Sequence, residues 1–202
     1  MFMLYGLLVG LVIGRITGGR IERLANVRLD WIGLAIGGLI VQLLLFSDPV
    51  TAVVGTLGPL LYVASTALVL IVVVRNIRIL AGLAVVAVGA ACNLAAIIAN
   101  GGYMPVTPGA LSAAEHVVKS GYSNSVLDPR PALEFLVDRF ALPPWVPFSN
   151  VFSIGDIIIS IGIAAVVVSA MRRSGPVAAP GSHERSGGTI AAMGSPGEAP
   201  TL

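Results

Sequence analysis

Five long apolar segments limit the fold of this chain more than any other feature. They cover residues 2–16, 31–46, 51–74, 79–100 and 151–171. A helix of about 20 residues crosses the roughly 30 Å hydrocarbon core of a bilayer, and it pairs its own backbone groups there. Charged residues make up only 11% of the chain, which is too few to cover a soluble protein of this length. The sequence therefore predicts an all-α fold, a polytopic membrane bundle of five transmembrane helices.

The distribution of arginine predicts how this bundle is oriented. Nine basic residues fall in the first connection, the third connection and the tail, namely Arg15, Arg20, Arg23, Arg28, Arg75, Arg78, Arg172, Arg173 and Arg185. The opposite side receives Lys119, Arg130 and Arg139. Because cytoplasmic loops are rich in Lys and Arg, we expect the N-terminus outside and the C-terminus in the cytoplasm.

The chain divides into a membrane domain, residues 1–171, and a tail, residues 172–202. The tail is rich in Gly, Ser, Pro and Ala, which predicts a disordered cytoplasmic extension containing His183. Within the membrane domain, residues 101–150 form an extracytoplasmic loop, here called the 101–150 loop. Gly101 and Gly102 are expected to end the preceding helix in left-handed geometry. Thr107-Pro108 predicts the start of a short helix to about Ser120, and residues 131–140 have the spacing of a second.

Small and polar residues inside the segments predict how the helices pack. Gly6, Gly10 and Gly14 are spaced by four, as are Gly33 and Gly37. Such stripes let helices approach closely, either within one chain or between two copies.

Two further residues of the apolar segments carry structural predictions. Gln42 is expected to donate a hydrogen bond between helices. Pro59 is expected to kink the third helix near its outer end.

Asp156, an acidic residue near the start of the last apolar segment, is the main candidate for a functional site. An ionised carboxylate costs about 2.5–3.5 kcal/mol at the centre of a membrane helix and less near its ends. Asn150 is the expected N-cap of this helix. Ser153, Asp156 and Ser160 fall on one stripe at helical spacing. That stripe should face the bundle, because polar residues inside a membrane avoid lipid.

Other polar side chains are expected to meet Asp156. Asn93 and Asn100 lie two helical turns apart on one face. The expected polar cluster consists of Asn93, Asn100, Asn150, Ser153, Asp156, Ser160 and Arg139. In a structural role, Asp156 is held by these groups and by the positive end of its own helix. Alternatively, Asp138 returns above Asp156, and two neighbouring carboxylates sharing one proton could act in acid–base catalysis.

The residues around the two aspartates resemble part of an enzyme family. The stretch from Asp138 to Asp156, with Asn150 before the second aspartate, is similar to the end of bacterial lipoprotein signal peptidase. In that family an Asp after a span and the Asp of an Asn-x-Ala-Asp motif form a catalytic dyad. The resemblance implies Asp138 and Asp156 as catalytic candidates, although Asn150 precedes Asp156 by six residues instead of three.

Three other motifs together resemble a second family. They are Arg28-Leu29-Asp30-Trp31, Asn100-Gly101-Gly102-Tyr103-Met104-Pro105-Val106 and Val151-Phe152-Ser153-Ile154-Gly155-Asp156. They are similar to an uncharacterised family of bacterial multi-span membrane proteins, a domain of unknown function that would cover about residues 1–171. The resemblance implies a five-span fold in the bacterial plasma membrane, without an established activity.

These observations predict a non-enzymatic membrane scaffold or binding protein whose 101–150 loop folds over the bundle. The alternatives are an intramembrane aspartyl-type hydrolase using Asp138 and Asp156, and a small-solute transporter. The expected partners are the lipid bilayer and, through the glycine-rich faces, a second copy or other membrane proteins. A net charge of +2 is too small to indicate a nucleic-acid partner. Because Cys92 is the single cysteine and His116 has no neighbouring ligand in the sequence, neither a metal nor a cofactor is expected.

Overall fold

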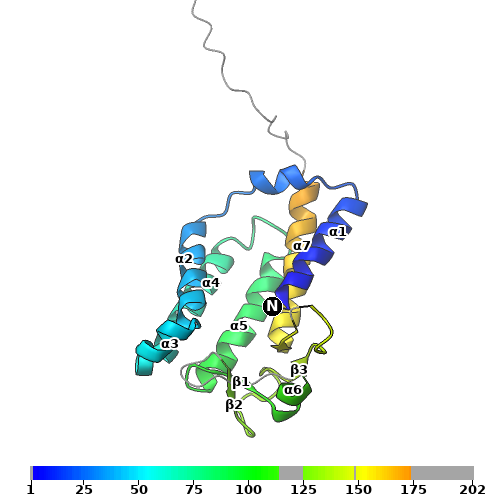
Figure 1. Ribbon diagram of the computed structural model, residues 1–202. Helices are drawn as coiled ribbons and strands as arrows, with labels where there is room; N and C mark the ends of the chain where they lie inside the picture. Colours follow the sequence, from blue (N-terminus) through cyan, green and yellow to red (C-terminus); the bar gives the residue numbers. More distant parts are fainter. Residues whose placement is uncertain (1, 114–124, 148, 174–202) are drawn as a thin grey trace, which may run out of the picture.

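The computed structural model describes residues 2–113, 125–147 and 149–173 (Figure 1). Its long helices are α1 (Met3–Ile16), α2 (Ile32–Leu45), α4 (Gly58–Arg75), α5 (Leu83–Ala99) and α7 (Ile154–Arg172). Shorter helical elements are η1 (Ile21–Asn26), α3 (Asp48–Val54), η2 (Gly55–Leu57) and α6 (Pro108–Ala113). The strands are β1 (Met104–Val106), β2 (Ser125–Leu127), β3 (Phe140–Ala141) and β4 (Val151–Phe152). The mostly helical structure agrees with the predicted all-α class.

Two stretches of the described chain are long and apolar enough to cross a membrane. They are Gly55–Arg75, with 21 residues, and Ile154–Arg172, with 19 residues. The other long helices α1, α2 and α5 are also apolar but contain 14, 14 and 17 residues. Each of the five falls in one of the segments that the sequence singles out, although α4 and α7 extend one residue beyond theirs, to Arg75 and Arg172.

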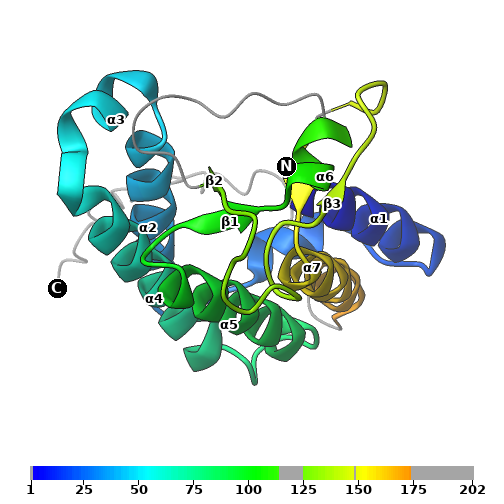
Figure 2. The ribbon, with the colours of Figure 1, turned by 90° about the horizontal axis from the view of Figure 1, so that it is seen from below.

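The long helices form an arc whose order in space differs from their order in the chain. α1 packs on α7, α7 on α5, α5 on α4, and α4 on α2. The view along the helices in Figure 2 shows α1 and α2 at the two ends of this arc. The last helix therefore lies between the first helix and α5, which gives the arc an inner, concave side.

Glycines allow α7 to approach both of its neighbours closely. Gly6, Gly10 and Gly14 are buried on α1, and a Cβ atom at Gly10 would lie 2.8 Å from the Ala164 Cα atom of α7. The first predicted glycine face thus packs within the chain. A second close contact joins α5 to α7, where a Cβ at Gly89 would lie 2.6 Å from the Gly155 backbone oxygen.

The second helix does not use its predicted glycine face inside the described chain. Gly33 and Gly37 have open space where a side chain would be, whereas Gly38 is buried against α4. Of the two alternatives that the sequence leaves open, packing within the chain is not used at Gly33 and Gly37 among the described residues, and contact between copies stays a prediction. Gln42 donates a hydrogen bond to Thr66 of α4 at 3.2 Å, which confirms the expected link between helices.

The third predicted helix, residues 51–74, is divided in the structure. α3 ends before Gly55, which has a φ of 49°, and α4 begins at Gly58 with Pro59 in its first turn. The predicted kink inside one continuous helix is thus wrong. Proline fits the first turn of a helix, where its missing N–H has no intrahelical partner.

The described residues of the 101–150 loop pack against one end of the long helices, here called the loop end. Figure 1 shows β1, β2, β3 and α6 gathered there. Gly101 and Gly102 have φ values of 70° and 89°, as predicted for the end of α5. α6 begins at Pro108 as expected, and the Ala110 N–H donates to Thr107 Oγ1 at 3.4 Å. The rest of that predicted helix, with His116, and the tail from residue 174, with His183, lie outside the described residues.

Residues 131–140 do not form the second predicted helix. Leu133 has a φ of 53°, which breaks a right-handed helix, and residues 132–136 form turns. The Ala132 N–H donates to Asn100 Oδ1, and Asn100 Nδ2 donates to the Ala132 backbone oxygen, both at 2.9 Å. A single amide side chain therefore fixes this turn on the end of α5.

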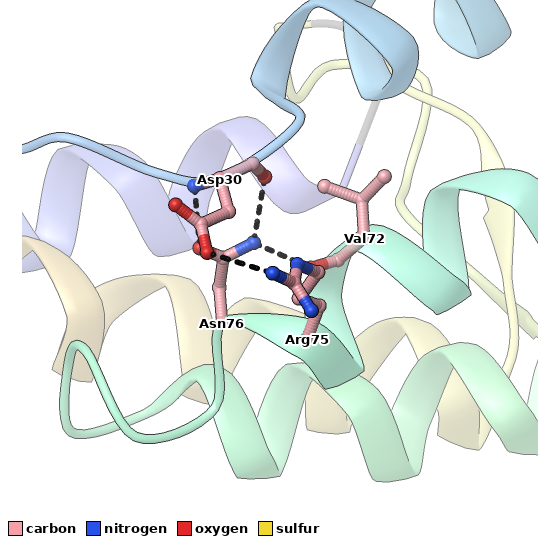
Figure 3. A network of polar contacts seen from close by, with 4 residues as sticks. All are labelled: Asp30, Val72, Arg75 and Asn76. Carbon is pink, nitrogen blue, oxygen red and sulfur yellow. Dashed lines mark hydrogen bonds and ion pairs between the residues drawn. The ribbon is translucent and has the colours of Figure 1, made fainter.

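A polar network at the opposite end, here called the arginine end, joins the start of α2 to the end of α4 (Figure 3). Asn76, 1% exposed, donates to the Asp30 backbone oxygen at 2.9 Å and to the Val72 backbone oxygen at 2.7 Å. Its Oδ1 accepts from the Asp30 N–H at 2.8 Å. Arg75 lies 3.5 Å from the Asp30 carboxylate and stacks 4.7 Å from the centre of the Trp31 ring. These contacts fix the connection between η1 and α2.

Candidate functional site

A cavity of about 730 Å³ lies on the concave side of the arc. All five long helices and the 101–150 loop contribute to its wall. Along α4, lining residues extend from Tyr62 to Val73, which corresponds to about 16 Å at 1.5 Å per residue. Toward the arginine end the wall is apolar, with Val69, Val73, Val86 and Ile163. The cavity is thus long and mostly apolar.

Polar side chains gather in the half of the cavity nearest the loop end. Asp138 and Asn150 come from the 101–150 loop, Asn93 from α5 and Asp156 from α7. Gln42 and Thr66, joined by their hydrogen bond, line the wall formed by α2 and α4. The cavity is therefore amphipathic along its length.

Asp156 is fixed by a capping box at the start of α7. Ser153 is the N-cap, so the prediction that Asn150 caps this helix is wrong. The Asp156 N–H donates to Ser153 Oγ at 3.1 Å, and the Ser153 N–H donates to Asp156 Oδ2 at 3.1 Å. Residues 151 and 152 instead form β4, which pairs with β3 in antiparallel fashion. This extended pairing holds Asn150 outside the helix.

Asn93 links this capping box to α5. Its Nδ2 donates to Asp156 Oδ1 at 2.8 Å, and its Oδ1 accepts from Ser153 Oγ at 2.9 Å. The close contact of Gly89 with Gly155 brings the two helices near enough for these bonds. Both oxygens of Asp156 thus accept hydrogen bonds, and the positive end of the helix dipole stabilises the carboxylate.

Asp138 has a very different environment. The residue is 6% exposed. Two backbone hydrogen bonds hold it against β1: the Asp138 N–H donates to the Pro105 oxygen, and the Thr107 N–H donates to the Asp138 oxygen, both at 3.0 Å. Its Oδ1 atom is buried and has no hydrogen-bond partner among the described residues. Burial raises the pKa of Asp138 from 3.8 to about 8, with a smaller contribution from the negative charge of Asp156. The positive charge of the chain's N-terminus opposes this change.

Asn150 adds a second unpartnered oxygen to the same end. Its Nδ2 donates to the Val151 backbone oxygen at 2.9 Å, while its Oδ1 is buried without a partner in the described part of the chain. Such buried atoms are uncommon in folded proteins, and each calls for a physical explanation. Among the described residues that line the cavity, there is no Lys, Arg or His.

The remaining residues of the predicted cluster lie elsewhere. Asn100 fixes the turn at Ala132. Ser160 is buried where α7 contacts Gly6 of α1, and Arg139 is exposed. The structure therefore brings together Asn93, Ser153 and Asp156 by hydrogen bonds and adds Asp138 and Asn150 around the cavity. In the described residues, no group of three His, Cys, Asp or Glu side chains is placed to hold a metal ion.

Sequence reasoning missed two parts of this site. The sequence Ser153-Ile154-Gly155-Asp156 before an apolar run is the pattern of a capping box, so the true N-cap could have been identified. By contrast, the approach of Gln42 and Thr66 to the same cavity carries no sequence signal, because it depends on the order of the helices around the arc.

Comparison with known proteins identifies the family. A family model described as a family of unknown function (DUF5317) matches residues 26–168. The chain therefore belongs to this family. No curated protein and no solved structure matches the chain.

Proposed function

We propose that this DUF5317 protein is a multi-pass protein of the bacterial plasma membrane, with its N-terminus outside, that binds an amphiphilic molecule in the cavity. In this proposal the protein is not an enzyme. The five long helices cross the membrane, the 101–150 loop covers the outer end of the bundle, and the cavity opens toward lipid between α1 and α2. The observation that carries the proposal is a long apolar cavity with polar side chains at one end.

The outward surfaces of the helices support a position in lipid. Large apolar side chains are exposed on each of the five long helices, for example Leu8 (50%), Leu43 (75%), Leu60 (65%), Val88 (57%) and Ile161 (59%). A soluble monomer rarely exposes apolar residues in such continuous areas. Lipid tails would cover them, and the arginines at the arginine end agree with a cytoplasmic location.

The helix arc supports access to the cavity from the bilayer. α1 and α2 end the arc, and both contribute lining residues, Leu4 and Leu7 from α1 and Leu39 and Gln42 from α2. A molecule that enters between them places its apolar tail against Val69, Val73 and Ile163. Its polar part then meets the loop end.

The proposal is tested by filling the cavity. Ala90 of α5 lines the cavity, whereas Ala84 of the same helix is exposed. Protein extracted from its membrane in a mild detergent and examined by native mass spectrometry is expected to retain a bound amphiphile. Ala90→Trp should lose it, and the control Ala84→Trp should keep it. The absence of any bound molecule in the parent protein, or its full retention in Ala90→Trp, would contradict the proposal.

A second candidate is the aspartyl-type hydrolase. It is favoured by one observation, since Asp138 and Asp156 line the same cavity end in different environments. A buried carboxyl with a raised pKa beside a hydrogen-bonded carboxylate is the combination used in general acid–base catalysis. This candidate predicts that Asp138→Asn and Asp156→Asn each abolish cleavage of a membrane peptide that the parent protein cleaves. Equal cleavage by the parent and both variants would exclude it.

The Gly33 and Gly37 face of α2 is proposed as a contact between copies or with another membrane protein. Small residues at this spacing favour close helix contact, and both positions are open. The variant Gly37→Cys in a Cys92→Ser background should form disulfide-linked dimers in native membranes, while the control Leu43→Cys, at an exposed position on a different face of α2, should not. Equal crosslinking at both positions would contradict a specific contact.

A further inference from the structure

We propose that the amphiphile bound in this cavity has a primary ammonium head, held by the carboxylate of Asp138 and the side-chain oxygen of Asn150, and a single apolar tail. This inference rests on the proposed function, because it specifies the ligand of the same cavity. It follows from the kind of polar atoms that are left unpartnered.

The unpartnered atoms that belong to cavity-lining residues are oxygens, and both are acceptors when Asp138 is ionised. Asp138 Oδ1 and Asn150 Oδ1 are both buried without a hydrogen-bond partner in the described residues, and both residues line the cavity. Asn93, which lines the same cavity end, donates to Asp156 and to neither of these two oxygens. A ligand that complements this end must therefore bring several N–H or O–H donors of its own.

The charges favour an ammonium group over a neutral donor. Asp138 and Asp156 lie on the same cavity end, and the charge of Asp156 is close enough to disfavour ionisation of Asp138. A cation placed beside Asp138 removes this penalty and allows the carboxylate to form. A primary ammonium also carries three donors, enough for Asp138 and Asn150 together.

The composition of the wall limits the rest of the ligand. No basic side chain lines the cavity in the described chain, and its polar end carries the two acidic residues Asp138 and Asp156, which would repel the negative charge of a phosphate group. Ordinary phospholipids with an amine head are thus disfavoured. The distance of about 16 Å from Tyr62 to Val73 along α4 suits one extended alkyl chain.

The test is a competition between molecules with the same twelve-carbon tail. Dodecylamine, dodecyltrimethylammonium, dodecanol and dodecanoate are added together at equal concentration to the full-length protein in detergent, and native mass spectrometry measures how much of each is bound. The parent protein should retain dodecylamine roughly tenfold over dodecanol, as expected for a charge-assisted hydrogen bond. The trimethylammonium head has the charge but no donor, so it should also bind more weakly.

Two variants separate the head from the tail. Asp138→Asn should lose the preference for dodecylamine while retaining dodecanol, because the apolar wall is unchanged. Ala90→Trp should lose all four molecules. If Asp138→Asn keeps the preference for dodecylamine, or if the parent protein shows no such preference, the inference of an ammonium head is wrong. The proposal that the cavity binds amphiphiles would survive either result. If the parent protein binds none of the four, the proposed function fails as well.

The pH dependence of dodecylamine binding provides a readout that a structural role for Asp138 would not change. The charged groups that act on Asp138 are Asp156 of α7 and the chain's N-terminus, while the neighbouring strand β1 (Met104–Val106) carries no charge. Because the ligand requires an ionised Asp138, the apparent affinity should rise up to tenfold per pH unit below pH 8 and level off above it. Asp138→Asn should show a flat profile over this range, and a flat profile in the parent protein would overturn the inference.

Discussion

Asp138→Asn offers a direct test of the buried carboxyl at the loop end. In the folded protein the pKa of Asp138 is raised from 3.8 to about 8 by burial and by Asp156. Between these two pH values the folded chain keeps a proton that the unfolded chain has released. The free energy of unfolding should therefore fall as the pH rises, by about 1.4 kcal/mol per pH unit at most. From pH 4 to pH 7 the loss amounts to roughly 4 kcal/mol.

The assay compares reversible unfolding of the parent protein and two variants in the same detergent, in half-unit steps from pH 4.5 to 8. Asp138→Asn has no proton to lose at this position, so its stability should change much less over the range. Glu134→Gln, which alters an exposed carboxylate of the same loop, serves as the matched control and should follow the parent protein. Parallel curves for the parent protein and Asp138→Asn, or a parent stability that increases with pH, would refute the reasoning.

Three further predictions concern packing and hydrogen bonds, each measured as the free energy of unfolding in detergent. Asn76→Ala removes three hydrogen bonds of a buried side chain at the arginine end and should cost roughly 2–4 kcal/mol. The control Asp30→Asn changes an exposed ion pair and should cost less than about 1 kcal/mol. Similar losses in the two variants would contradict the network of Figure 3. Gly10→Leu forces α1 away from the backbone of α7 and should cost about 1–3 kcal/mol. The control Val9→Leu, at an exposed position of the same helix, should change stability by less than about 0.5 kcal/mol. The reverse order would show that α1 does not pack as described. Ser153→Ala removes both the cap on the Asp156 N–H and the bond to Asn93 Oδ1 and should cost about 1–3 kcal/mol. No loss in Ser153→Ala would argue against the capping box.

The positions of the long helices could be predicted because their apolar runs are bounded by clear polar signals. The Gly101-Gly102 pair ends α5 where left-handed geometry is required, and Ser153 begins α7 three residues before an acidic partner. The contact of Asn93 with Asp156 was also foreseeable, since each residue lies on the polar side of its helix. These features depend on local sequence alone.

The arrangement around the cavity could not be predicted, because it depends on contacts between distant parts of the chain. Nothing local shows that α7 packs between α1 and α5. Residues 131–140 have helical spacing, yet the bonds between Asn100 and Ala132 hold a turn there, and Asp138 bonds to Pro105 beside β1. Because Asp138 is bonded to Pro105, it lies in the wall of the cavity and not on the surface helix that its sequence spacing predicts.

The most direct measurement is an experimental structure of the protein purified from its own membrane with bound molecules retained. We expect elongated density for a bound amphiphile in the cavity. Its head should lie within hydrogen-bond distance of Asp138 and Asn150, and its tail should extend toward Val73. A cavity closed by its own side chains, or an Asp138 carboxyl paired with another residue of the chain and no bound amphiphile, would contradict this expectation.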